Sequence, residues 1–459
     1  VLGYALAGLH LGYITLFSLG TSRLEGWWSP ASNVIQPDLI ATYQPWLLAV
    51  ALNLFAATWE ESVFRAIPLA GAALLGARFG RRGWWIGAAM VLQAVVFAAG
   101  HANYPQQPSY ARVVELIAPA LVWGFVYLRV GLFPTIVAHF LYNLYLTAIP
   151  LFQMSAAGIW VDRAVILGVA AIPLLVVVWA RSRYGATLDA DDEARNGAWS
   201  AAEDGAGNLF GPEATAADRP DTDAVGADRA AAESAPTPAP PAAAGPALRL
   251  PFSERLALPV GLVLLAGAWL LGDRAELRPA TTTRAEAINI ATAELRARGF
   301  DPDAWDASAE FTTEGGQSYQ WVFEERGAEA YDRLLGTWLA APHWHVRFAD
   351  FDRGAEERVE TFTVVVESDG AVSGFTHALP ESRPGAELEE GEARALAQGH
   401  LGDVLGLDVD DFEEIAAQQE ALPARRDWTF GLRPRGLLPD SAGEARLNVA
   451  VAGDEVVSV

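Results

Sequence analysis

The sequence contains no cysteine and no lysine. Without cysteine there are no disulfides, thiolate metal ligands or cysteine nucleophiles, and the redox compartment stays undecided. The basic residues are therefore all arginines, 32 of them against 56 Asp+Glu, for a formal net charge of −24 at pH 7. So acidic a chain is not expected to bind nucleic acid, because that partner requires a basic surface.

Apolar residues make up 52% of the 459 positions and are concentrated before Arg181 and near Leu256. Such a distribution indicates membrane spans, with the lipid bilayer as a partner, rather than one large soluble core. Runs of spanning length occur at 2–19, 45–79, 84–100, 113–130, 132–152 and 164–180. The second run is too long for one straight span, and Pro68 and Gly71 are expected to kink it.

The short loops predict the orientation. If the spans alternate, one side of the membrane holds Arg78, Arg81, Arg82, Arg129, Arg181 and Arg183. The other side holds Arg23, Arg112 and Arg163. The side richer in arginine is expected in the cytoplasm. The alanine-rich, lysine-free composition favours a bacterium, which predicts an integral protein of the inner (plasma) membrane.

The rest of the chain divides by composition. Residues 184–250 are rich in Ala, Asp and Pro, and are predicted to form a disordered linker. An additional span is expected at 256–272, which would make the C-terminal domain extracytoplasmic. The predicted fold class is an all-α polytopic membrane domain, 1–183, plus a small α+β soluble domain, 280–459.

The soluble domain is predicted to consist of two tandem helix-strand repeats. Helical patterns at 284–305 and 392–412 are each followed by strand patterns, at 344–348 and 360–366 in the first repeat and at 428–430 and 446–451 in the second. This outline resembles tandem PepSY-like modules. Such modules are associated with restraining peptidases, so the resemblance implies regulation or substrate capture.

Charged side chains inside membrane spans need a reason, since a central charge costs ~2.5–3.5 kcal/mol on insertion scales. The second run contains Glu60-Glu61-Ser62-Val63-Phe64-Arg65. Glu61 and Arg65 share a helix face and can pair, while Glu60 points elsewhere and is free to face a cavity and to take a proton from water. The alternative is a salt-bridge network that only fixes helix packing.

Two further polar sites lie in neighbouring spans. His101 ends an apolar helix, and alone it would be an ordinary helix-end histidine. His139 and Asn143 share a face and, alone, would equally form an interhelical hydrogen-bonding pair. Together with Glu60, these groups can activate water, position it or bind a metal, and stabilise an oxyanion.

In combination, Glu60-Glu61-x-x-x-Arg65, Phe97-x-x-x-His101 and His139-x-x-x-Asn143 resemble the CPBP (ABI) family. Its members are intramembrane glutamic endopeptidases related to type II CAAX prenyl proteases. The resemblance covers about residues 45–152. It implies that Glu60 is the general base, that His101 positions the water, and that His139 and Asn143 form the oxyanion hole. Glu61 and Arg65 would support the site.

The resemblance implies no cofactor, but zinc remains an alternative, with Glu60, His101 and His139 as the ligands. None of them lies in a His-Glu-x-x-His helix. The expected substrate is a membrane-embedded or membrane-associated protein or peptide. The alternative function is a non-catalytic membrane protein that binds peptides, confers bacteriocin immunity or acts as a scaffold. A transporter would also place charges at mid-membrane, but the spans show no inverted repeat.

The remaining histidines carry weaker predictions. His343 and His345 flank Trp344, and alternation along a strand would put both on one face. They are a possible metal pair, although a solvated strand face is the favoured interpretation. His10, His377 and His400 have no partner that the sequence identifies.

Overall fold

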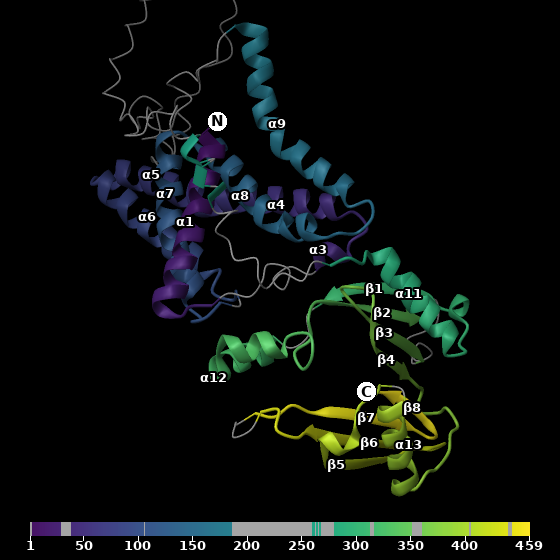
Figure 1. The fold of residues 1–459 in the computed structure, drawn as a ribbon. Coiled ribbons are helices and arrows are strands. Elements are labelled where there is room, and N and C mark those ends of the chain that lie inside the picture. Colours follow the sequence, from purple (N-terminus) through teal and green to yellow (C-terminus); the bar gives the residue numbers. More distant parts are fainter. Residues whose placement is uncertain are drawn as a thin grey trace, which may run out of the picture. The chain divides into compact units, whose positions relative to one another are not determined.

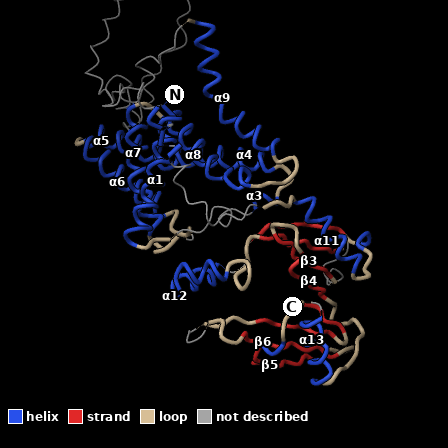
Figure 2. Tube along the Cα trace, viewed as in Figure 1, coloured by secondary structure: helices blue, strands red, loops and turns tan. Residues whose placement is uncertain are grey.

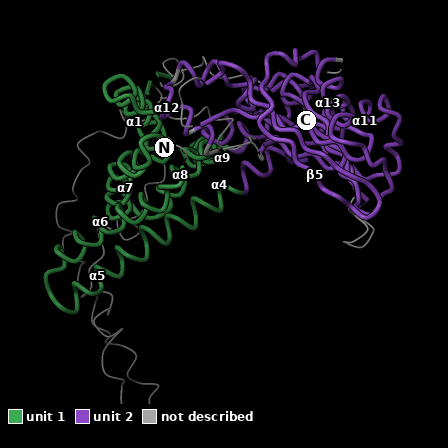
Figure 3. Tube along the Cα trace, turned by 90° about the horizontal axis from the view of Figure 1, so that it is seen from below, with its two compact units in different colours: residues 1–28, 52–144, 170–272 green, residues 29–51, 145–169, 273–459 purple. Residues whose placement is uncertain are grey.

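The computed structural model describes residues 2–28, 38–104, 106–185, 280–312, 316–350, 360–403, 405–438 and 443–459, with short pieces between 259 and 267. The predicted linker, from residue 186 on, and most of the predicted span 256–272 lie outside the described residues. The chain forms two compact units, shown in Figure 3: one comprises 1–28, 52–144 and 170–272, and the other comprises 29–51, 145–169 and 273–459.

The N-terminal part of the chain is helical, as Figures 1 and 2 show. Six candidate membrane spans occur in the part that the structure describes, and they match the six predicted runs. They are α1 (Leu2–Glu25), α4 (Pro45–Glu61) continued by α5 (Ile67–Phe79), α6 (Arg82–Ala99), α7 (Ala111–Arg129), α8 (Leu132–Gln153) and α9 (Trp160–Tyr184). The predicted all-α membrane domain is confirmed.

The long second span is irregular, but not where the sequence predicted. A π-helical segment, Ser62–Ala66, joins α4 to α5, whereas the kink was expected at Pro68 and Gly71. Pro68 lies within the first turn of α5, where its missing N–H costs little. Its ring would still clash with the backbone one turn earlier, so the widened turn precedes it. Single-turn π segments occur frequently at functional sites.

The described pieces of the predicted span 256–272 are helical and pack closely on α1. A Cβ added at Gly8 would lie 2.5 Å from the carbonyl oxygen of Gly261, and one at Gly12 would lie 2.6 Å from Leu264 Cβ. Small residues four apart allow membrane helices to approach this closely.

The described residues of the C-terminal part form an eight-stranded antiparallel sheet with the strand order β1-β2-β3-β4-β8-β7-β6-β5. Its first half comprises α11 (Arg284–Ala297), β1 (Asp306–Thr312), α12 (Gly316–Leu334), β2 (His343–Ala349), β3 (Thr361–Glu367) and β4 (Val372–Ala378). Its second half comprises α13 (Glu390–Asp403), β5 (Phe412–Ala421), β6 (Arg426–Pro434), β7 (Leu447–Ala452) and β8 (Glu455–Ser458). The predicted small α+β domain with two helix-strand repeats is confirmed in outline.

The two halves repeat a local pattern. α11 and α13 are each followed by a glycine with positive φ, Gly299 (87°) and Gly406 (65°). A 3₁₀ turn with an aspartate N-cap then leads into the first strand. The helices therefore end at Ala297 and Asp403, earlier than the predicted ranges 284–305 and 392–412, because a left-handed glycine terminates an α-helix.

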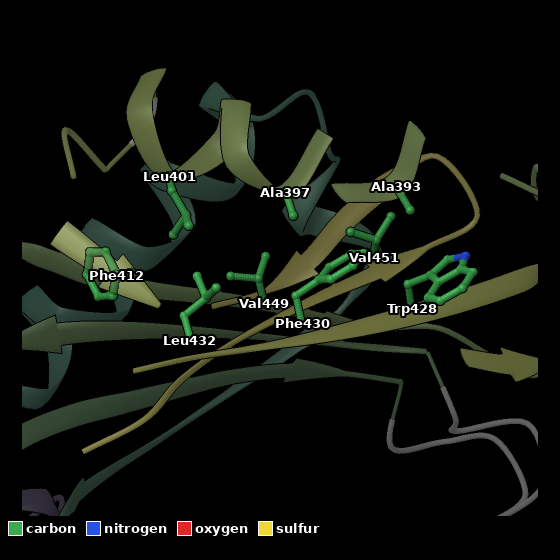
Figure 4. Close-up of a cluster of buried hydrophobic side chains, with 9 residues drawn as sticks. All are labelled: Ala393, Ala397, Leu401, Phe412, Trp428, Phe430, Leu432, Val449 and Val451. Atoms are coloured by element: carbon green, nitrogen blue, oxygen red, sulfur yellow. The ribbon is translucent and has the colours of Figure 1, made fainter. Parts of the chain in front are cut away.

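In the second half, α13 covers the sheet with a small apolar core, drawn in Figure 4. Ala393, Ala397 and Leu401 follow helical spacing and point at the strands. Their partners come from the three strands β5, β6 and β7: Phe412, Trp428, Phe430, Leu432, Val449 and Val451. The core explains why this acidic sequence folds into a layered structure rather than staying extended.

The halves meet at β4 and β8, which share the pair Thr376 and Ser458. His377 strengthens this joint, since its Nδ1 lies 2.7 Å from Glu455 and its Nε2 lies 3.1 Å from Glu360. The sequence had identified no partner for His377. The prediction of a solvated strand face at His343 is wrong, because His343 is only 3% exposed.

Candidate active site

Three helices bring Glu60, Glu61, His101 and His139 together within one compact unit. Glu60 and Glu61 end α4, where the π segment begins, and His101 lies two residues beyond α6. His139 lies in the middle of α8, and Asn143, which is half-buried, follows one turn later. The sequence spacing thus becomes one cluster, because the end of α4, the end of α6 and the middle of α8 meet.

Glu61 is the centre of a buried network. Its Oε1 lies 3.4 Å from Arg65 Nη1, the pairing expected from their four-residue spacing, and 2.8 Å from His139 Nδ1. Glu61 and Arg65 are both 0% exposed and His139 is 4% exposed. A buried carboxylate needs such partners, because an unpaired buried charge is very costly.

Aromatic side chains hold the cation of this network. The guanidinium carbon of Arg65 lies 4.1 Å from the ring centroid of Phe97 and 5.7 Å from that of Trp123. Trp123 also meets the His139 ring edge-on at 4.8 Å. These contacts pack aromatic rings against both Arg65 and His139, and cation–π contacts gain strength when desolvated.

Glu60 lies apart from this network and faces both histidines. Its Oε2 lies 3.7 Å from His139 Nε2 and 4.0 Å from His101 Nε2. These separations exceed hydrogen-bond length, and Oε2 is buried with no hydrogen-bond partner among the described residues. Polar groups separated in this way are commonly linked through one water molecule.

The hydrogen bonds at Nδ1 determine the tautomers of His101 and His139, and so whether Nε2 turns a proton or a lone pair toward Glu60. His101 Nδ1 lies 2.8 Å from the carbonyl oxygen of Phe97, which can only accept, so this nitrogen carries the proton. His139 Nδ1 donates in the same way to Glu61. Each neutral ring therefore turns an Nε2 lone pair toward Glu60, and an Nε2–H exists only on an imidazolium.

The zinc alternative needs three of these groups around one ion. Within the described ranges, no group of three His, Cys, Asp or Glu residues is arranged to hold a metal. Glu60 Oε2 lies 3.7 Å from His139 Nε2 and 4.0 Å from His101 Nε2, whereas ligand atoms placed tetrahedrally at about 2.0–2.2 Å from zinc are about 3.3–3.6 Å apart.

Two residues that pack around the site were missed in the sequence. Trp123 contacts both Arg65 and His139, yet it lies in an uninterrupted apolar run and gave no signal. His10 packs behind it, stacked on Tyr142 at 3.9 Å and edge-on to Trp123 at 5.0 Å. Only the rarity of a histidine inside a membrane span could have singled out His10.

One stretch of the chain is similar to a known protein family. Residues 42–145 match the family model described as type II CAAX prenyl endopeptidase Rce1-like. No curated protein and no solved structure matches the chain. The matched range contains every residue of the predicted site, and it indicates a protease of the membrane. The predicted resemblance is therefore confirmed over residues 42–145, which are similar to the Rce1-like type II CAAX prenyl endopeptidases.

Proposed function

We propose that this protein is an intramembrane endopeptidase in which Glu60 activates water without a metal cofactor. One observation carries the proposal: Glu60 Oε2 is buried, makes no hydrogen bond among the described residues, and faces the Nε2 atoms of His101 and His139. A carboxylate that serves only to pair a cation would sit on Arg65, as Glu61 does.

In the proposed reaction, a water molecule donates one hydrogen bond to Glu60 Oε2 and the other to His101 Nε2. Glu60 removes the first proton as the water oxygen attacks the carbonyl carbon of the peptide bond. The tetrahedral intermediate then collapses, the C–N bond breaks, and Glu60 gives the proton to the leaving amine. The glutamate ends the cycle ionised, as it began.

The oxyanion that forms during attack needs N–H donors. Asn143 provides an amide, one turn from His139 on α8. His139 can donate from Nε2 only as an imidazolium, because its Nδ1–H is already committed to Glu61. The bond to Glu61 also holds the ring in place, so the Glu61–Arg65 pair acts on catalysis by positioning His139.

The substrate is a membrane-embedded or membrane-associated protein or peptide, reached from the bilayer. A bacterial membrane peptide fits the alanine-rich, lysine-free composition better than a prenylated protein does. The same composition and the arginine distribution support a location in a bacterial inner (plasma) membrane. The C-terminal domain, proposed to be PepSY-like and extracytoplasmic, would regulate the peptidase or capture its substrate.

The test is cleavage of a broad peptide library by the purified full chain in detergent, with products identified by mass spectrometry. Wild type is compared with Glu60→Gln, which keeps the shape and removes the base. Glu25→Gln, at the exposed end of α1, is the matched control. Cleavage by wild type and the control, but not by Glu60→Gln, is expected. If the three proteins behave alike and none cleaves a peptide, an immunity or scaffold function is favoured instead.

A further inference from the structure

Strand β2 presents two histidines on one face of the C-terminal sheet. His343 and His345 are separated by one residue, so alternation turns both away from the side of Trp344. Their Nε2 atoms lie 3.0 Å apart, and the ring centroids lie 4.8 Å apart. The pair is far from the peptidase motifs in the sequence, and the proposed reaction makes no use of it.

The His343 ring is oriented as a metal ligand would be. Its Nδ1 lies 2.7 Å from the carbonyl oxygen of Ala341, which can only accept, so Nδ1 carries the proton. The lone pair is then on Nε2, which points at His345. Metal-binding histidines almost always donate their other N–H to a carbonyl or carboxylate in this manner.

Side chains hold the backbone of residues 340–342, just N-terminal to His343, in the absence of any ligand. The Tyr319 hydroxyl donates to the carbonyl of Ala340, and the Ser368 hydroxyl donates to the carbonyl of Pro342. Together with the Ala341 bond, three successive carbonyls are held by side chains. With His343 97% buried as well, its Nε2 is set before any ligand arrives, which lowers the entropy cost of binding.

The surrounding charges favour a cation. The register places Glu310 on β1 directly opposite His345, and Glu367 on β3 directly opposite His343. Directly opposite residues share a face of the sheet. Arg347 lies on the same face, two residues beyond His345, so the two carboxylates leave one surplus negative charge.

We propose that His343 and His345 bind one borderline first-row divalent cation: Cu²⁺, Ni²⁺ or Zn²⁺. Two imidazole nitrogens at about 2.0–2.1 Å from one ion are about 2.9 Å apart at a right angle and about 3.3 Å apart at a tetrahedral angle. The observed 3.0 Å lies between these values. Imidazole suits all three ions, and Cu²⁺ binds most tightly.

The two histidines are the protein ligands of this site, and water completes the coordination. The described residues contain no group of three His, Cys, Asp or Glu side chains placed to hold a metal. The 3.0 Å separation also suits a simple N–H···N hydrogen bond between the rings. An experiment must therefore distinguish an ion-binding pair from a hydrogen-bonded pair.

The experiment titrates Cu²⁺ into the purified full chain in detergent, with any affinity tag removed, and records the electron paramagnetic resonance spectrum. His345→Gln removes one ligand at a half-buried position, and His400→Gln, on α13, is the matched control. A third variant, His139→Gln, reports on copper held in the membrane site. Circular dichroism and thermal melting without metal verify that each variant is folded.

We expect one copper ion per chain with hyperfine coupling to two imidazole nitrogens in the wild type, His400→Gln and His139→Gln. His345→Gln should weaken this binding at least tenfold and lose one nitrogen coupling. Unchanged affinity in His345→Gln would overturn the proposal. So would a wild-type spectrum with fewer than two coupled nitrogens, which is independent of how any variant folds, or binding lost only in His139→Gln.

Discussion

Replacing either of the two adjacent glutamates of α4 by glutamine should have different effects on the stability of the fold. Glu61 accepts from His139 and pairs with Arg65 at a fully buried position. Glu61→Gln keeps the volume but leaves the guanidinium buried without its counter-ion. Removing one partner of a buried pair costs about 3–5 kcal/mol. Glu60→Gln removes a carboxylate whose Oε2 has no hydrogen bond among the described residues, so no comparable loss is expected.

Thermal unfolding in detergent measures the difference. At about 2–4 °C for each kcal/mol, Glu61→Gln should lower the melting temperature by on the order of 10 °C. Glu60→Gln should melt at or above the wild-type temperature, with Glu25→Gln as the surface control. Peptide cleavage should fall in both Glu60→Gln and Glu61→Gln. A Glu61→Gln protein with wild-type melting and cleavage would refute the assignment of Glu61 as the anchor of Arg65 and His139.

Three further predictions concern other parts of the chain. His10 is 7% exposed, and its ring nitrogens have no hydrogen-bond partner among the described residues. Because a buried polar group without a partner is costly, His10→Phe should raise the melting temperature and leave cleavage unchanged. Lost cleavage would mean that the ring takes part in the chemistry. Phe430 is 1% exposed, and Phe430→Ala should cost about 3–5 kcal/mol in denaturant unfolding of the C-terminal domain; a cost under about 1 kcal/mol would contradict the core described here. Burial, and then Arg298, lower the pKa of His400, so the unfolded chain binds this proton more tightly. The contribution of His400 to stability is full above about pH 6.5 and is lost as the pH falls below that value. His400→Gln should therefore flatten the stability–pH curve below about pH 6.5. An unchanged curve would count against this role of His400.

The spans and the grouping of the membrane site could be predicted because both depend on local signals. Apolar runs of spanning length must be helices, since lipid leaves no other way to satisfy the backbone. Charges in such runs are costly enough to mark a site, which is how Glu60 and His139 were found. Trp123 was missed because it carries no charge, and an aromatic residue in an apolar run looks like any other lipid-facing or core residue.

Features that depend on tertiary packing were predicted less well. Alternation placed His343 and His345 on one face, but no sequence pattern shows what covers that face, so the burial of His343 was not foreseen. The irregularity of the second span was predicted at Pro68 and Gly71, but the structure has it as a π segment at Ser62–Ala66. Helix α12 was missed, because Gly327, with a φ of 77°, divides it into two shorter helical stretches.

The central claim is that Glu60 activates water for peptide hydrolysis without a metal. The measurement is the single-turnover cleavage rate of wild type and Glu60→Gln, each with and without a strong chelator. A lost general base predicts a rate at least about 10²–10⁴-fold lower for Glu60→Gln, with the wild-type rate unchanged by chelator. A wild-type rate abolished by chelator and restored by zinc, or a Glu60→Gln rate equal to wild type, would contradict it.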